Sequence, residues 1–176
     1  VVAGGGDISW SNLVELSLAE DWRVDVVADL STGSLASLAT ARALPDRRFS
    51  FHRLDLASPA VVDLITHRSP DVIFHLAAQI DVRVSVARPV FDATVNVIGS
   101  LNVFEGAVAA GVKKIVFAGS GGTLYGRPER IPTTESAAQR PESPYGVATK
   151  AVGEYLSSYR SPRRRRYPAP APAHVT

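Results

Sequence analysis

Short runs of β-branched residues alternate with longer amphipathic segments along most of this 176-residue chain. The alternation predicts strands at residues 1–3, 23–28, 49–54, 71–76 and 114–118, and helices at residues 11–20, 35–43, 58–67, 90–110 and 144–159. Strands joined by helical crossovers form a parallel sheet with helices on both faces. Because such crossovers are right-handed, we expect an α/β fold with a doubly wound parallel sheet. Ligands bind such sheets at the carboxyl ends of the strands.

Two helix boundaries are marked by residue type. Ser58 and Pro59 suit the cap and first position of the helix expected at 58–67. Gly111 suits the C-terminal cap of the helix expected at 90–110.

Composition argues against several function classes. The net charge is only +2, so the composition predicts no nucleic-acid binding. The chain has no cysteine and its four histidines are scattered, which predicts neither disulfides nor a metal site. No apolar run reaches the ~20 residues that span a bilayer, and the N-terminus lacks the pattern of a signal peptide. We therefore expect a cytoplasmic protein with no membrane partner.

The two ends of the chain are unusual. There is no methionine, not even at position 1, so the chain is processed or is a fragment that starts upstream. Residues 161–176 contain four consecutive arginines and alternating proline and alanine, which cannot form a helix or a central strand. We expect a domain at 1–160 and a disordered Arg/Pro/Ala tail at 161–176, solvated rather than bound to an acidic partner. The sheet would then be incomplete on its C-terminal side, with an uncovered edge.

A glycine-rich loop joins the first expected strand to the first expected helix. It reads Gly4-Gly5-Gly6-Asp7-Ile8. The pyrophosphate of a dinucleotide binds free N–H groups at a helix N-terminus in such a place. Glycines there permit the tight turn and the close approach of the phosphate. Taken alone, the loop is equally compatible with a plain turn that binds nothing.

This loop resembles that of the extended short-chain dehydrogenase/reductase family, and within it the NAD-dependent epimerases and dehydratases of sugar nucleotides. Further resemblance lies in residues 26–33, 74–83, 96–100, 117–126 and 141–147, and extends to about residue 160. It implies a Rossmann-like domain that binds NAD and works on a nucleotide-sugar.

Some positions depart from the family pattern. The family's loop carries glycines where this chain has Gly4, Asp7 and Trp10. Asp7 would place a carboxylate beside the pyrophosphate, and Trp10 would fill space where helix and strand should touch. The acid that binds the adenosine ribose aligns with Ala28. Asp29 is the candidate substitute, although successive strand residues point to opposite faces.

The resemblance implies the following cofactor-binding positions: Gly4, Gly5, Gly6, Asp7, Ile8, Asp29, Asp55, Leu56, Leu76, Ala77, Ala78 and Asn96. Asp55 and Leu56 would lie along the adenine, and the small residues at 76–78 would let the backbone pass close to the cofactor. The alternatives are an ordinary loop acid at Asp55 and a solvent-facing Asn96. His75 is expected to be a packed strand residue, and the choice between NAD and NADP stays open.

By the same resemblance, a tyrosine, a lysine and a serine or threonine would carry the chemistry. Tyr145 would take the proton from the sugar's 4-hydroxyl as hydride moves to NAD. The lysine is expected four residues later, but that position holds Thr149 and Lys150 comes fifth. In a regular helix Lys150 lies about 140° around the axis from Tyr145. A single π-bulge would restore the pairing.

The serine or threonine position is ambiguous. By resemblance it falls on Gly121, with Ser120 and Thr123 beside it as candidates. A 4,6-dehydratase would carry an Asp-Glu pair where this chain has Gly122-Thr123, and water elimination needs such carboxyl groups. The sequence therefore favours epimerisation at C4 of a UDP-hexose through a transient 4-keto sugar.

Two functions stay open for the chain. The first is a UDP-hexose 4-epimerase, and the second is a non-catalytic nucleotide-binding module or an inactive remnant. A π-bulge between Tyr145 and Lys150 would favour the first, and a regular helix the second. The family's substrate domain would follow residue 160 and is expected to be absent, so we expect impaired turnover and weak or no NAD binding. The helices at 90–110 and 144–159 would serve a homodimer.

Overall fold

The computed structural model describes residues 1–4, 8–43, 48–128, 130–159 and 171–175 of the chain. The strands are β1 (Val2–Ala3), β2 (Val24–Ala28), β3 (Phe49–Arg53), β4 (Val72–His75), β5 (Lys114–Ala118) and β6 (Ala171–Val175). The helices are α1 (Ile8–Ala19), the 3-10 helix η1 (Leu35–Leu38), α2 (Ala39–Arg42), α3 (Ala60–Arg68), α4 (Val82–Ala87), α5 (Pro89–Ala93), the π-helical turn η2 (Thr94–Ile98), α6 (Gly99–Ala110), α7 (Gly121–Leu124) and α8 (Pro144–Tyr159). Each element expected from the sequence is present, and its boundaries agree to within about three residues.

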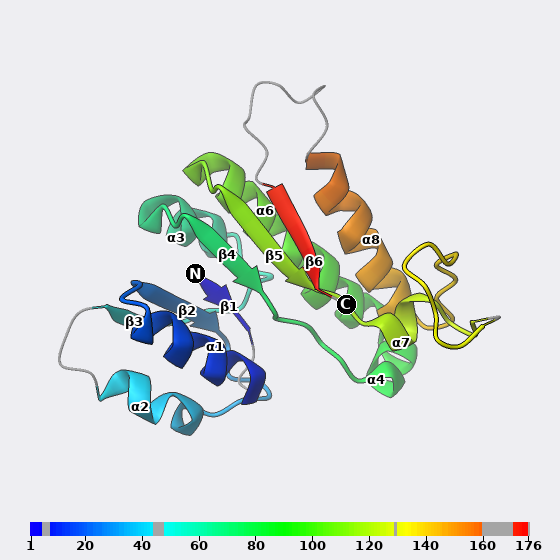
Figure 1. The fold of residues 1–176 in the computed structure, drawn as a ribbon, viewed down its shortest axis with the longest axis horizontal. Helices are drawn as coiled ribbons and strands as arrows, with labels where there is room; N and C mark the ends of the chain where they lie inside the picture. Colours follow the sequence, from blue (N-terminus) through cyan, green and yellow to red (C-terminus); the bar gives the residue numbers. More distant parts are fainter. Residues whose placement is uncertain (5–7, 44–47, 129, 160–170, 176) are drawn as a thin grey trace.

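The strands form one parallel sheet in the order β3-β2-β1-β4-β5-β6 (Figure 1). β1 pairs with β2 on one side and with β4 on the other, so that Val2 lies opposite both Val26 and Phe74. The direction of winding reverses between β1 and β4, which is the topological switch point of a Rossmann-like sheet. The expected doubly wound α/β fold is confirmed.

The two faces of the sheet carry separate cores. Val2 and Val26 pack with α1 and η1 on one face, whereas Ala3 and Val27 pack with α3, α6 and α8 on the other. This follows from the strand geometry, because successive side chains point to opposite faces. Figure 1 shows α1 and α2 on one side of the sheet and α3, α6 and α8 on the other.

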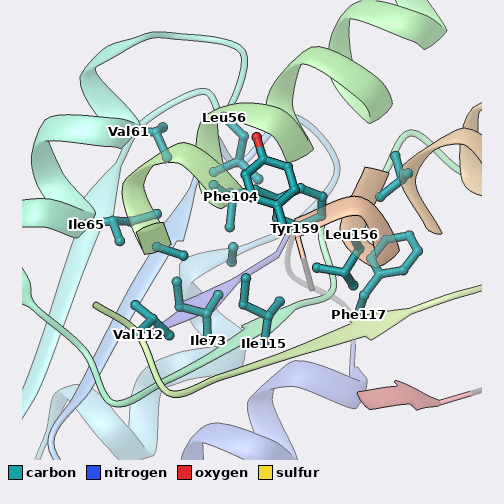
Figure 2. Packing of buried hydrophobic residues seen from close by; sticks show 14 of the residues in the cluster. Leu56, Val61, Ile65, Ile73, Phe104, Val112, Ile115, Phe117, Leu156 and Tyr159 are labelled. Carbon is teal, nitrogen blue, oxygen red and sulfur yellow. The ribbon is translucent and has the colours of Figure 1, made fainter. Parts of the chain in front are cut away.

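The larger core lies between the sheet and helices α3, α6 and α8 (Figure 2). The rings of Phe104 and Tyr159 meet edge to face with centroids 5.7 Å apart, and the Tyr159 hydroxyl donates to Glu105. Helices α3 and α6 approach closely at Gly106, where an added Cβ would lie 2.9 Å from the Ile65 Cβ. The absence of a side chain at Gly106 thus sets the distance between these helices.

Helices α5, η2 and α6 form one continuous segment from Pro89 to Ala110. Gly111 follows it with φ of 67°, the left-handed cap that the sequence predicts. With 22 residues and a mean hydropathy of 1.2, the segment has the length and composition of a membrane span. Its helices pack against α3 and α8, which buries 39% of the apolar window.

The end of the chain differs from the expectation. The sequence predicts a disordered tail at 161–176, whereas β6 (Ala171–Val175) pairs in parallel with β5 and places the open edge of the sheet at β6. β6 ends the strand order, and an edge strand tolerates proline because one side of its backbone has no neighbour. Residues 161–170 and Thr176 lie outside the described part of the chain.

Two short helices were not expected from the sequence. Asp81 caps α4, and its Oδ1 accepts hydrogen bonds from the backbone N–H groups of Arg83 and Val84 at 2.8 and 3.3 Å. α7 follows β5 and contains two glycines, which obscure a helical pattern.

Candidate functional site

The strands β1 and β4 end side by side at the switch point of the sheet. The carbonyl oxygen of Ala3 accepts the N–H groups of both Leu76 and Ala77, at 2.7 and 2.8 Å. Gly4 is buried, and its N–H donates to the Val27 carbonyl at 3.1 Å. A Cβ added to Gly4 would lie 3.4 Å from the Leu76 Cβ, so a larger side chain there would meet the β4 segment. The structure thus brings Gly4 together with Leu76 and Ala77 at the switch point.

The rest of the glycine-rich loop is described only in part. Gly5, Gly6 and Asp7 lie outside the described residues, and Ile8 begins α1. Trp10 stands where the family has a glycine, and its indole is buried in the core between α1 and the sheet. A large aromatic group therefore fills the place where family members need close contact between helix and strand.

The end of β2 presents Ala28 and Asp29 in different environments. Ala28 is buried, whereas Asp29 is exposed. Asp29 Oδ1 accepts hydrogen bonds from the N–H and the hydroxyl of Ser31, at 2.9 and 2.8 Å. The carboxylate is thus held by its own turn. A contact between Asp29 and a ribose stays a prediction.

The turn after β3 holds Asp55 and Leu56. Asp55 is exposed and its Oδ1 accepts the Ala57 N–H at 2.8 Å. Leu56 is buried in the larger core, and its carbonyl accepts Nδ2 of Asn102 at 2.8 Å. Hydrogen bonds within the protein account for the positions of Asp55 and Leu56. Their contact with an adenine stays a prediction.

Asn96 is buried rather than solvent-facing. Its Oδ1 accepts the Gln79 N–H at 2.8 Å, and its Nδ2 donates to the Gln79 carbonyl at 3.0 Å. The same Nδ2 donates to Asp92 Oδ1 at 3.0 Å, which also accepts Nε2 of Gln79. Burial raises the pKa of Asp92, and the hydrogen bonds from Gln79 and Asn96 act in the opposite direction. Ala78, between Ala77 and Gln79, is exposed.

His75 is a packed strand histidine, as the sequence predicts. It is buried against Phe117 and Phe104, and its Nε2 lies 2.7 Å from the Ser100 hydroxyl. That hydroxyl donates to the Asn96 carbonyl, so Nε2 of His75 is the donor toward Ser100. Burial lowers the pKa of His75 from 6.5 to about 4, which keeps the ring neutral at pH 7.

Helix α8 is regular across the Tyr145 segment and has no π-bulge there. Thr149 lies one turn after Tyr145, and its hydroxyl donates to the Tyr145 carbonyl at 2.9 Å. Both side chains are buried. Lys150 points elsewhere, and its Nζ donates to the Gln139 carbonyl at 3.2 Å. The structure therefore does not pair Lys150 with Tyr145.

Helix α7 packs directly on the start of α8. A Cβ added to Gly146 would lie 2.6 Å from the Thr123 carbonyl oxygen. The Thr123 hydroxyl donates to the Ser120 carbonyl at 3.3 Å, so it is already used within α7. Ser120 precedes α7 and its side chain does not cap the helix. Ser120 and Thr123 thus lie on a segment that contacts the helix of Tyr145.

A cavity of about 110 Å³ lies between the end of β5 and α8. Its lining comprises Phe117, Gly119, Leu124, Gln139, Thr149, Lys150, Gly153, Glu154 and Ser157. Lys150 belongs to this lining and Tyr145 does not. Among the described residues no group of three or more histidine, aspartate or glutamate side chains is placed to hold a metal ion.

The sequence matches the family model for GDP-mannose 4,6 dehydratase over residues 2–165. It is also 42% identical over 162 residues to a UDP-glucose 4-epimerase of Mycolicibacterium smegmatis, covering 92% of this chain and 51% of the relative. The chain belongs to the NAD-dependent epimerase/dehydratase family.

Two solved epimerase structures share the fold. The UDP-glucose 4-epimerase of Thermus thermophilus in complex with NAD is 38% identical, with a TM-score of 0.80 over 90% of this chain and 49% of the other. The enzyme of Thermotoga maritima with UDP-glucose is 34% identical, with a TM-score of 0.80 over 89% and 49%. The chain spans about half the length of these epimerase/dehydratase-family relatives.

In this epimerase/dehydratase-family domain, the sequence does not predict the roles of Asp92 and Thr149. Asp92 was not singled out, although it precedes Asn96 by one helical turn, a spacing that places two side chains on one face. Thr149 occupies the position where a lysine is expected, four residues after Tyr145, and its hydroxyl donates to the Tyr145 carbonyl. The π-helical turn that carries Asn96 has no sequence signal of its own.

Proposed function

We propose that this chain is an NAD-binding domain of the UDP-sugar 4-epimerase type. The observation that carries the proposal is the buried Gly4 at the β1–β4 switch point, where its backbone faces Leu76 and Ala77. Dinucleotides bind doubly wound sheets at this point. A relative with 38% identity has been solved with NAD.

The cofactor would lie across the carboxyl ends of the strands. Gly4, Gly5, Gly6 and the start of α1 would receive its pyrophosphate. Asp29 would face the ribose, the Asp55–Leu56 turn would face the adenine, and the segment from Leu76 to Ala78 would pass close to the nicotinamide half. When bound, NAD would supply a hydride acceptor and return the hydride later.

The substrate that fits the family is a UDP-hexose. The Thermotoga maritima relative was solved with UDP-glucose. A dehydratase would carry acids where this chain has Gly122-Thr123. We therefore propose epimerisation at C4, rather than water elimination, as the reaction of this type of domain. Tyr145 would hold the proton of the sugar hydroxyl, with Ser120 or Thr123 as hydrogen-bond partner of the same oxygen.

Turnover by this chain is expected to be impaired. A lysine ammonium on the face of Tyr145 would favour its phenolate, but Lys150 donates to the Gln139 carbonyl instead. The buried Thr149 supplies no charge in its place. The regular α8 therefore favours the second candidate function, a nucleotide-binding module that does not catalyse the reaction.

Calorimetric titration with NAD tests the proposed site. We expect weak binding, with a Kd on the order of 1 mM, because Asp7 and Trp10 replace two glycines of the loop. Gly4→Leu should abolish this binding, because the new side chain would enter the Leu76 contact. Wild-type protein that shows no heat of binding at saturating NAD would refute the proposal, and a micromolar Kd would refute the expected weakness.

We also propose that the chain is cytoplasmic and forms a homodimer through the helices at 90–110 (α5, η2 and α6) and at 144–159 (α8). α8 packs beside α5 and η2. These helices expose five large apolar side chains, those of Val90, Phe91, Ile98, Val147 and Tyr155. Sedimentation equilibrium should give the mass of a dimer for wild type and of a monomer for Val147→Glu. A monomeric wild type would contradict the assembly.

A further inference from the structure

The peptide unit of Gln79 is held on both sides by one side chain. Asn96 accepts the Gln79 N–H through Oδ1 at 2.8 Å and donates to the Gln79 carbonyl through Nδ2 at 3.0 Å. These two hydrogen bonds resemble those that a neighbouring strand would make with Gln79, although Asn96 lies on a helix. Gln79 thus has a fixed backbone position beyond the end of β4.

The helix that carries Asn96 is built to hold it there. Asn96 is the central residue of the π-helical turn Thr94–Ile98. The Ser100 hydroxyl donates to the Asn96 carbonyl, and His75 Nε2 donates to that hydroxyl at 2.7 Å. The turn is therefore tied to β4 through two buried side chains, and π-helical turns occur frequently at functional sites.

Asp92 supports Asn96 from one turn earlier on the helix. Its Oδ1 accepts Nδ2 of Asn96 and Nε2 of Gln79, each at 3.0 Å. Asp92 is 1% exposed, and its Oδ2 has no hydrogen-bond partner among the described residues. A buried carboxylate without a cation is costly, and burial raises the pKa of Asp92 accordingly.

The segment between β4 and Gln79 lies beside the end of β1, where we propose that NAD binds. Its first end is fixed because Leu76 and Ala77 both donate to the Ala3 carbonyl. Its second end is fixed by Asn96 at Gln79. Only Ala78 stands between the two anchors. Movement of Gln79 would therefore change how the backbone at Ala77 and Ala78 meets a bound dinucleotide.

We propose that Asn96, supported by Asp92, is a positioning residue that clamps the Gln79 peptide and thereby fixes the backbone beside the proposed NAD site. The consequence for NAD rests on the proposed function, whereas the clamp itself does not. Asn96 acts through the backbone of Gln79 and needs no contact with the cofactor.

Hydrogen exchange at the Gln79 amide, followed by NMR, tests the clamp. Asn96→Ala should speed exchange at Gln79 about tenfold, the effect of one lost hydrogen bond. Ile73 in β4 and Ile115 in β5 should keep their protection. Asn102→Ala is the matched control, because Asn102 lies on the same helical segment and donates to a different carbonyl, that of Leu56. It should leave exchange at Gln79 unchanged.

A second pair of variants separates the clamp from general stability. Asp92→Ala removes the support of Asn96 and should also speed exchange at Gln79. Asp92→Asn keeps an oxygen that can accept from Asn96 and Gln79, and exchange at Gln79 should stay near the wild-type rate. Unchanged exchange at Gln79 in both alanine variants would overturn the clamp, and so would an equal loss of protection at Ile73 and Ile115.

NAD titration of the same variants tests whether the clamp affects cofactor binding. If wild type binds NAD, Asn96→Ala should weaken binding about tenfold and Asp92→Asn should not. Equal NAD affinity in Asn96→Ala and wild type would overturn the proposed effect of the clamp on NAD binding. If wild type does not bind NAD, the proposed function is wrong. The hydrogen-exchange experiment still tests the clamp independently.

Discussion

Thr149, and not Lys150, lies one helical turn after Tyr145 on the same face of α8, where its hydroxyl donates to the Tyr145 carbonyl at 2.9 Å. The additional residue between tyrosine and lysine is absorbed by rotation around a regular helix rather than by a bulge. Lys150 consequently reaches the Gln139 carbonyl and lines the cavity beside β5. The position of Lys150 therefore depends on the number of residues between it and Tyr145 in α8.

Deleting Ala148 would move the lysine to the fourth position after Tyr145. We expect no turnover with UDP-glucose, and a loss of about 3 kcal/mol or more in the free energy of unfolding. The deletion rotates the later half of α8 by about 100°, which removes Leu156 and Tyr159 from the core. Urea denaturation and a coupled epimerase assay provide the two measurements. Measurable epimerisation by the variant would contradict the prediction.

Asp7→Gly should strengthen NAD binding about tenfold, because it removes a carboxylate from the loop that we propose binds the pyrophosphate. Titration of both proteins at low salt measures the change. Asp63→Asn, at an exposed carboxylate on α3, is the control that removes the same charge and should leave NAD affinity unchanged. An equal or weaker affinity after Asp7→Gly would show that the pyrophosphate does not bind there.

Trp10→Gly should not restore the family's loop. The Trp10 indole is buried with Val14 and Leu18, so its removal leaves a large cavity. We expect a loss of about 3–5 kcal/mol in the free energy of unfolding, measured by urea denaturation. Trp10→Phe, which keeps an aromatic ring in the core, should lose less than half as much. Unchanged stability of Trp10→Gly would argue against the described packing of α1.

Gly106→Ala should destabilise the protein by about 1–2 kcal/mol. The new Cβ would lie 2.9 Å from the Ile65 Cβ in the contact between α3 and α6. The helical propensity of alanine offsets part of this loss. Gly122→Ala in α7 is the control, because an added Cβ meets nothing within 4 Å there and stability should not fall. Thermal unfolding that ranks the two variants in the reverse order would contradict the helix contact.

Stability should fall as the pH is lowered from 6.5 to about 4 because of His75. Its pKa is about 4 in the fold and 6.5 as an unperturbed group, so the unfolded chain binds the additional proton in this window. The contribution amounts to about 3 kcal/mol, lost progressively toward pH 4 and constant below it.

Urea denaturation of wild type and His75→Gln between pH 4 and 7 isolates this effect. Asp92, whose pKa burial raises, changes stability in the opposite direction in both proteins, so its contribution cancels in the comparison. The difference in unfolding free energy between the two proteins should shrink as the pH falls. Parallel pH profiles would show that His75 is not the responsible group.

The sequence alone determined the architecture of this protein. Side-chain periodicity and residues such as Gly111 act over one or two turns, so the strands, the helices and the parallel winding could be predicted from local pattern. The family motifs also marked the loop at Gly4 and the segment around Tyr145, because each is a short run with its own signature.

Only the tertiary structure decided how the candidate site is assembled. The direction of Lys150 depends on which face of α8 packs against the sheet, and the burial of Asp92 depends on Gln79 arriving from another element. The pairing of β6 with β5 is likewise a contact between distant parts of the chain. Such contacts depend on side chains far apart in sequence, and for that reason no local pattern predicts them.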